Sequence, residues 1–170
     1  MQAPLVMTVI GKDRTGLVES VAHLVAEHGG NWLESRMCRL GGEFAGLVRV
    51  SVPAAQRQAL EAALGKLSDL AIVVRSDEPT PSAGPAVLVS LEVVGQDRPG
   101  IVREITRALS AQGINVEELT TECVSAPMSG ELLFQANARI SVPAGVALDK
   151  LRQTLENVLS GLTVELARIN

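Results

Sequence analysis

Two turns in this sequence carry residues suited to binding a small charged molecule. They consist of Asp13, Arg14, Thr15, Gly16 and Leu17, and of Asp97, Arg98, Pro99, Gly100 and Ile101. An aspartate carboxylate accepts hydrogen bonds from an ammonium group, and a glycine at a helix start lets backbone N–H groups approach a carboxylate closely. Each turn therefore offers groups that match both ends of an α-amino acid.

An asparagine follows each turn at the same distance. Asn31 lies 15 residues after Gly16, and Asn115 lies 15 residues after Gly100. The asparagine amide is both a donor and an acceptor, so it can complete a polar site. A turn of this kind can also serve the fold alone, with the aspartate as a local backbone acceptor. Because the whole set is repeated, we predict that both turns and both asparagines bind ligand.

The arginines leave alternatives open. Arg14 and Arg98 either steer an anion toward the turn or lie over it in solvent. Arg49 and Arg139 are also equivalent in the repeat, and we expect them at the surface, with a salt bridge between domains as the alternative.

The turns belong to a longer repeat that divides the chain. Val9–Val18 returns with similar residues as Val93–Val102, at an offset of 84 (97 − 13) in a chain of 170 residues. A period of about half the length predicts two domains, at 1–76 and 86–170. Residues 77–85 are polar and contain three prolines, which is typical of a semi-extended linker.

Each half reads as strand, helix, strand, strand, helix, strand. The first strand is an apolar run over Leu5–Ile10, and the first helices end at Gly29 and Gly113, where a left-handed cap favours glycine. The second copy has six additional residues, which we place in the hairpin between strands two and three. The predicted fold is α+β, with two tandem ferredoxin-like βαββαβ domains. Each is a four-stranded antiparallel sheet with both helices on one face.

Residue types typical of catalytic or metal sites are scattered. His23 and His28 occur only in the first copy and fit solvated helix positions, and Glu118 and Glu122 share a face of an exposed or interface strand. Cys38 and Cys123 fit reduced, half-buried strand positions. We therefore predict no catalytic residues, no metal and no cofactor.

Composition argues against nucleic acid and membrane partners. The net charge is −4, no Lys/Arg cluster occurs, and Trp32, Phe44 and Phe134 are the only aromatic residues. Direct binding to nucleic acid needs a basic footprint or stacking aromatics, so we expect none. No stretch approaches the length of a membrane span, and the N-terminus lacks a signal-peptide pattern, which predicts a cytoplasmic protein.

The second turn, Asp97-Arg98-Pro99-Gly100, resembles the first turn of ACT domains. The first copy has Thr15 where proline is usual. Because the likeness covers almost the whole chain as two copies without an attached enzyme or DNA-binding domain, the sequence resembles the glycine cleavage system transcriptional repressor family. The resemblance implies that a small amino acid, glycine or a similar one, binds at domain interfaces. It also implies action through a partner regulatory protein.

The expected function is that of a non-catalytic regulatory protein that modulates a partner, with an indirect role in transcription regulation of the glycine cleavage system. The alternatives are an assembly scaffold and a separately encoded regulatory subunit of an amino-acid metabolic enzyme. The second strand lies at a sheet edge, and edges invite pairing with other edges. Pairing within one chain or between the chains of a homodimer remains open.

Overall fold

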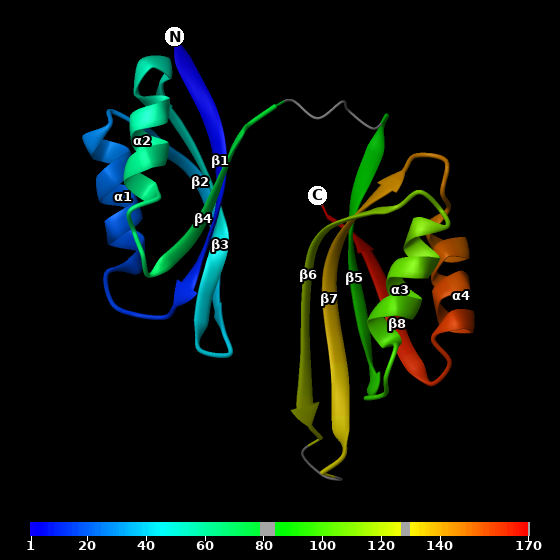
Figure 1. Ribbon diagram of the computed structural model, residues 1–170. Helices are drawn as coiled ribbons and strands as arrows, with labels where there is room; N and C mark the ends of the chain where they lie inside the picture. The colour runs from blue at the N-terminus through cyan, green and yellow to red at the C-terminus, as the bar shows by residue number, and fades with distance from the viewer. Residues whose placement is uncertain (79–83, 127–129, 170) are drawn as a thin grey trace. The chain divides into compact units, whose positions relative to one another are not determined.

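The chain folds as two compact units, Met1–Pro81 and Ser82–Asn170. The structure is a computed structural model that describes residues 1–78, 84–126 and 130–169. Both units have the predicted α+β architecture, with two helices on one face of a four-stranded sheet (Figure 1). The predicted linker, 77–85, includes residues 79–83, which lie outside the described residues.

The elements of the first unit follow the predicted order and extend beyond several predicted ends. They are β1 (Gln2–Lys12), α1 (Leu17–Glu27), β2 (Asn31–Leu40), β3 (Glu43–Pro53), a short 3₁₀ helix η1 (Ala54–Gln56), α2 (Arg57–Leu64) and β4 (Leu70–Ser76). Pro53 ends β3 and η1 follows at once, because proline cannot donate to a strand ladder but suits the start of a helix.

The second unit repeats this order. Its elements are β5 (Ala86–Gln96), α3 (Ile101–Ser110), β6 (Asn115–Ser125), β7 (Leu132–Pro143), α4 (Leu148–Val158) and β8 (Leu162–Arg168). The longer hairpin connection lies between β6 and β7, as predicted, although its residues 127–129 are outside the described part of the chain.

The sheets have the same strand order in both units, β2-β3-β1-β4 and β6-β7-β5-β8, and every pair is antiparallel. In β1, the alternate residues Leu5, Met7 and Val9 are fully buried, because successive strand residues point to opposite faces. β1 is hydrogen-bonded to a strand on each side, so its last residue has a fixed position at one end of the sheet. The chain continues from that end into α1.

The helices bury one stripe each against the sheet. In α1 the buried residues are Leu17, Val21 and Val25, at the spacing of one helical face. Val18 lies beside this stripe and is 40% exposed. The chain leaves α1 through Gly29 at φ 68°, a left-handed conformation that favours glycine.

The expected half-burial of the two cysteines was wrong. Cys38 and Cys123 are free thiols, as predicted, but both are exposed rather than half-buried. They lie in β2 and β6, which are edge strands of the two sheets that the described residues form. Leu67 packs against the core from the turn that follows α2.

Each core depends on leucines that the helices insert over the sheet. Leu60 of α2 and Leu155 of α4 are fully buried, so Leu60→Ala and Leu155→Ala should each lower the unfolding free energy by about 2–5 kcal/mol. Leu40→Ala is the matched control, because Leu40 is 80% exposed and its truncation should change stability by less than about 0.5 kcal/mol. Chemical denaturation measures all three. Similar losses in the control and the core variants would contradict this assignment of the cores.

Candidate functional site

The first predicted turn is fixed to the end of the sheet by its own backbone. The Asp13 N–H donates to the Gly42 carbonyl at 3.0 Å, which ties the turn to the β2–β3 hairpin. Gly16 follows at φ 82° as the cap of α1, a conformation that side chains other than glycine rarely adopt. The sequence therefore needs glycine here for its backbone conformation, since a Cβ at this position would meet only Arg14 Nη1, at 3.9 Å.

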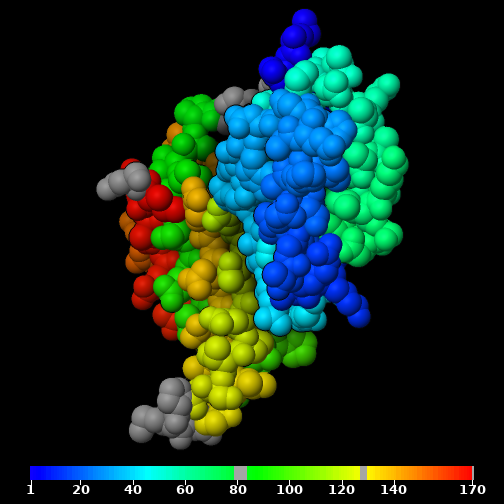
Figure 2. Space-filling view, turned by 90° about the vertical axis from the view of Figure 1, so that its left-hand side faces the viewer, coloured from blue at the N-terminus to red at the C-terminus, as the bar shows by residue number. Residues whose placement is uncertain are grey.

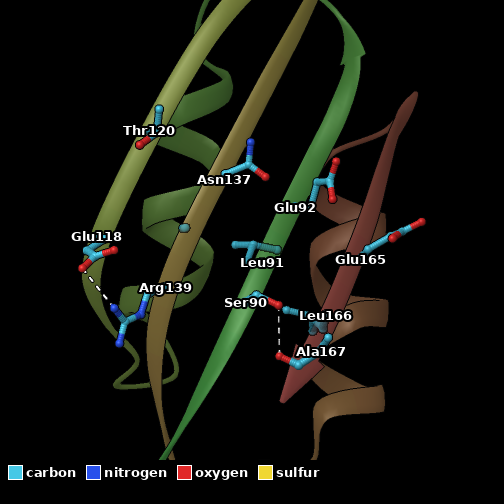
Figure 3. Close-up of a pocket in the computed structure, with 11 residues that line it drawn as sticks. Ser90, Leu91, Glu92, Glu118, Thr120, Asn137, Arg139, Glu165, Leu166 and Ala167 are labelled. Carbon is cyan, nitrogen blue, oxygen red and sulfur yellow. Dashed lines mark hydrogen bonds and ion pairs between the residues drawn. The ribbon is translucent and has the colours of Figure 1, made fainter. Parts of the chain in front are cut away.

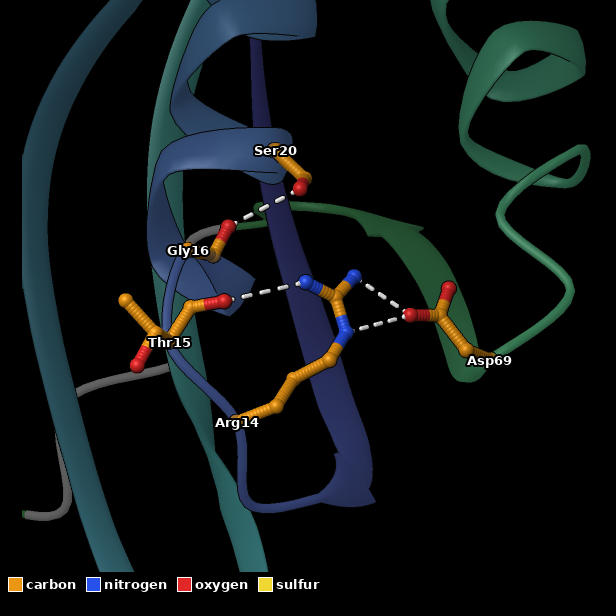
Figure 4. A network of polar contacts seen from close by, with 5 residues as sticks. All are labelled: Arg14, Thr15, Gly16, Ser20 and Asp69. Atoms are coloured by element: carbon orange, nitrogen blue, oxygen red, sulfur yellow. Dashed lines mark hydrogen bonds and ion pairs between the residues drawn. The ribbon is translucent and has the colours of Figure 1, made fainter.

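Arg14 is held by an ion pair within its own unit. Its Nε donates to Asp69 Oδ2 at 2.6 Å, and its Nη1 donates to the Thr15 carbonyl at 3.2 Å (Figure 4). Asp69 lies in the connection between α2 and β4. The Arg14 hydrogen bond is the largest effect that lowers the pKa of Asp69. We expected Arg14 either to steer an anion toward the turn or to lie over the turn in solvent. Neither role describes a guanidinium that is bound to Asp69 and to the Thr15 carbonyl.

The start of α1 leaves backbone donors open. The Gly16 carbonyl accepts from both the N–H and the hydroxyl of Ser20, each at 2.9 Å. The N–H groups of Val18 and Glu19 donate to no carbonyl among the described residues. The first N–H groups of a helix have no partner within the helix, and they favour an anion. The side chain of Leu17 is buried, so Leu17 can contribute only its backbone.

The second turn has the same backbone and different side-chain partners. The Asp97 N–H donates to Leu132 O at 2.9 Å, and Gly100 caps α3 at φ 94°. Arg98 forms a bidentate ion pair with Glu104 of α3, at 2.9 and 2.6 Å. Ile101 is buried, as Leu17 is. Pro99 stands in the place of Thr15, so the predicted residues of each turn do lie together.

The predicted asparagines lie at the other end of each sheet. Asn31 pairs with Ser51, which pairs with Pro4, whereas the turn follows Lys12. Eight residues of strand separate the two positions, on the order of 26 Å. Asn115 is placed in the same way and donates to a neighbouring glutamate at 2.8 Å. A turn and an asparagine can therefore meet only if they come from different units.

Asn31 lies in a groove between α1 and the start of β2. Figure 2 shows α1, in blue, and the adjoining β2 at the surface of the first unit. The groove has a volume of about 410 Å³ and is lined by Val18, Ala22, Val25, Ala26, Gly30, Asn31 and Trp32. It is mainly apolar and runs beside the edge of the sheet, where β2 has no outer neighbour.

A polar cavity that the sequence did not indicate lies on the helix-free face of the second sheet. It has a volume of about 360 Å³ (Figure 3). Its polar side chains are Ser90, Glu92, Glu118, Thr120, Asn137, Arg139 and Glu165. Strand register sets them in two rows, and Glu92 lies directly opposite Glu165. Arg139 pairs with Glu118 at 3.1 Å within the unit.

The corresponding face of the first unit has different chemistry. Thr8, Leu47 and Val73 form a row across three strands where the second unit has Glu92, Asn137 and Glu165. Arg49 pairs with Asp77 at 2.6 Å. The helix-free faces have therefore diverged far more than the turns have.

The described residues contain little that suggests chemistry beyond binding. Within 1–78, 84–126 and 130–169, no group of three or more His, Cys, Asp or Glu side chains is arranged to hold a metal ion. His23 is exposed on α1, and His28 Nδ1 contacts the Leu24 carbonyl at 2.8 Å at the helix end. Among the same residues, no helix has the length and apolarity needed to cross a membrane.

Comparison with known families agrees with this geometry. Residues 3–75 match one ACT domain model, and residues 89–155 match another. The chain belongs to the ACT domain family. Its first and second units are thus two ACT domains in tandem, and each match includes one of the two turns.

Relatives that align with nearly the whole chain include a regulator of transcription. The chain is 28% identical over 167 residues to the glycine cleavage system transcriptional repressor of Escherichia coli K12, covering 95% of this chain and 85% of that protein. The crystal structure of an unknown protein from Galdieria sulphuraria matches with a TM-score of 0.89 and 29% identity over the full length of both chains. A protein provisionally named as such a repressor shares the fold, with a TM-score of 0.71, 24% identity and coverage of 100% of this chain and 99% of that one. The ACT domains and these likenesses support a regulatory role.

Sequence reasoning missed the partners of the turn. Asp69 and Glu104 hold the two arginines, but they are not equivalent in the repeat, so no shared spacing pointed to them. Arg39 pairs with Asp13, and the residue at the same offset of 84 is Cys123. That difference was visible in the sequence and indicates that the two turns are not equivalent.

The ion pair of the second turn predicts a specific titration. The Arg98 hydrogen bond is the largest effect that lowers the pKa of Glu104. A lowered carboxyl pKa stabilises the fold above the ordinary carboxyl pKa, and this stabilisation is lost as pH falls through the lowered value. Arg98→Gln should therefore return the pKa of Glu104 toward its ordinary value in a carboxyl NMR titration. Arg14→Gln is the matched control, which should raise the pKa of Asp69 and leave Glu104 unchanged. An unaltered Glu104 pKa in Arg98→Gln would refute the pairing.

Proposed function

We propose that this protein is a non-catalytic regulator that binds a small amino acid, glycine or a similar one, at its strand-to-helix turns. Binding alters its affinity for a partner regulatory protein, through which it acts indirectly on transcription of the glycine cleavage system. The observation that carries the proposal is the presence, in each turn, of an aspartate three residues before the left-handed glycine at which a helix starts. The name of the Escherichia coli relative suggests the pathway.

The two ends of an amino acid have opposite charges, and a turn of this kind can offer a group for each. The open N–H groups of Val18 and Glu19 in the first turn suit a carboxylate. The aspartate that precedes them suits an ammonium group. Recognition of both ends would distinguish an amino acid from a simple anion or a simple amine. The buried side chains of Leu17 and Ile101 hold the helix starts in place beneath the ligand.

A complete site requires two ACT domains. Since Asn31 and Asn115 lie at the far ends of their sheets, each would complete a turn that belongs to another domain. Pairing of the β2 or β6 edges, within a chain or in a homodimer, would bring such parts together. A ligand bound there would favour the paired arrangement by its differential affinity, typically about 1–3 kcal/mol.

Regulation through a partner protein fits the charge of the chain. Its net charge is −4, and neither ACT domain carries a run of lysines and arginines. Affinity for DNA phosphates depends on such a run. The charge does not distinguish this function from the two alternatives, an assembly scaffold and a separately encoded regulatory subunit of an amino-acid metabolic enzyme. Ligand binding distinguishes the scaffold from the regulator and from the regulatory subunit.

Thermal unfolding against a panel of amino acids tests ligand binding. At roughly 100 times its Kd, a ligand of the native state raises the unfolding free energy by about 2.7 kcal/mol and so raises the melting temperature. We expect a selective increase with glycine or another small amino acid. Glycinamide and acetate, which each lack one charged end, are the matched controls and should give little change. If no amino acid shifts the melt at millimolar concentration, the scaffold is favoured.

A mobility-shift assay with DNA tests the indirect mode of action. The chain alone should show no sequence-specific binding to the promoter region of the glycine cleavage genes at physiological salt, because it lacks a basic footprint. Adding the partner regulator and the amino acid should change the partner's DNA binding. Tight specific binding by this chain alone would exclude the indirect mode.

A further inference from the structure

The two turns differ at the residue beside their aspartate. In the first ACT domain, Arg39 of β2 pairs with Asp13, with 2.8 Å between Nε and Oδ2. Arg39 lies opposite Phe44 in the sheet, and Phe44 lies opposite Gly11. This row is the second-last of the sheet, and the last one pairs Leu40 with Glu43 and Glu43 with Lys12, after which the turn begins. A guanidinium therefore already stands against the Asp13 carboxylate.

The second ACT domain has a neutral side chain in the same place. Cys123 lies opposite Phe134, which lies opposite Gly95, so it occupies the register position of Arg39. Partial desolvation, and then the charge and hydrogen bonding of the Asp97 carboxylate, raise the pKa of the Cys123 thiol. The thiol is thus protonated at neutral pH and brings no charge to the turn.

No other cation compensates Asp97 within the part of the chain that the structure describes. Its turn neighbour Arg98 is turned away, with two nitrogens bound to Glu104 at 2.9 and 2.6 Å. Gln96 stands where the first domain has Lys12. Asp97 forms no ion pair among residues 1–78, 84–126 and 130–169.

We propose that the ammonium group of the ligand binds at Asp97 in the second ACT domain and not at Asp13, where Arg39 already occupies its place. The inference rests on the proposed function and adds to it that the chain has one amino-acid site rather than two equal ones. In the first turn, an ammonium group would have to displace or share a guanidinium, and two cations beside one carboxylate repel each other. The first turn keeps its open N–H groups and lacks a free carboxylate.

Exchanging the residues beside the two aspartates, Arg39 and Cys123, tests the assignment of the ammonium site to Asp97. Glycine, L-alanine and L-serine are each titrated by calorimetry into the full-length protein under reducing conditions. The unsubstituted protein should bind one amino acid per chain. Cys123→Arg should weaken this binding by on the order of tenfold or more, since it competes for a charge-assisted hydrogen bond. Cys123→Ser, which keeps a small neutral side chain, is the matched control and should bind as before.

The reciprocal variant distinguishes an effect on ligand binding from a loss of folding. Arg39→Cys frees Asp13 and should add a second binding event per chain, a gain that a misfolded protein cannot produce. Melting temperatures without ligand confirm that all three variants are folded. Two equal sites in the unsubstituted protein, or full binding by Cys123→Arg, would overturn the inference and leave the proposed function intact. Absence of binding by the unsubstituted protein would overturn the proposed function, and the inference with it.

Discussion

Burial of one sheet face beneath two helices determines where everything else in each ACT domain lies. Because strand side chains alternate, the choice of Leu5, Met7 and Val9 as the buried set assigns every other residue of β1 to the open face. β1 is hydrogen-bonded on both sides, so its last residue has a fixed position. The first helix must start beside that residue and lie over the apolar face. The sharp change of direction explains the left-handed glycines at positions 16 and 100.

Features set by short-range sequence patterns could be predicted, and those set by distant loops could not. Alternation and helical spacing gave the element order and both buried faces, because burial repeats with the period of the backbone. The ion pair of Arg14 with Asp69 depends on a connection 55 residues away, and no periodicity marks it. The opposite placement of the turn and Asn31 did follow from topology. β3 is antiparallel to both β1 and β2, so β2 runs parallel to β1 and starts at the same end of the sheet.

In the proposed site, recognition of the ligand would be divided between backbone and side chains. The anionic end of a ligand would meet N–H groups of the helix start, which exist whatever the local side chains are. The cationic end would meet an aspartate whose availability depends on its neighbour. The arginines of the turns do not enter this balance, because Asp69 and Glu104 hold them. On this proposal, substitutions near the aspartates would change ammonium binding while the turn keeps its shape.

The duplication itself has a consequence for symmetry. In a homodimer of single ACT domains, a substitution would appear in both sites at once, so the two could never be tuned apart. A tandem chain removes that constraint, since Arg39 and Cys123 can be selected independently at equivalent positions. The helix-free faces have used the same freedom, with Leu47 in one domain where Asn137 stands in the other. One domain can then have a residue that leaves its aspartate open to a ligand while the other has a residue that blocks it. Two identical subunits cannot differ in this way.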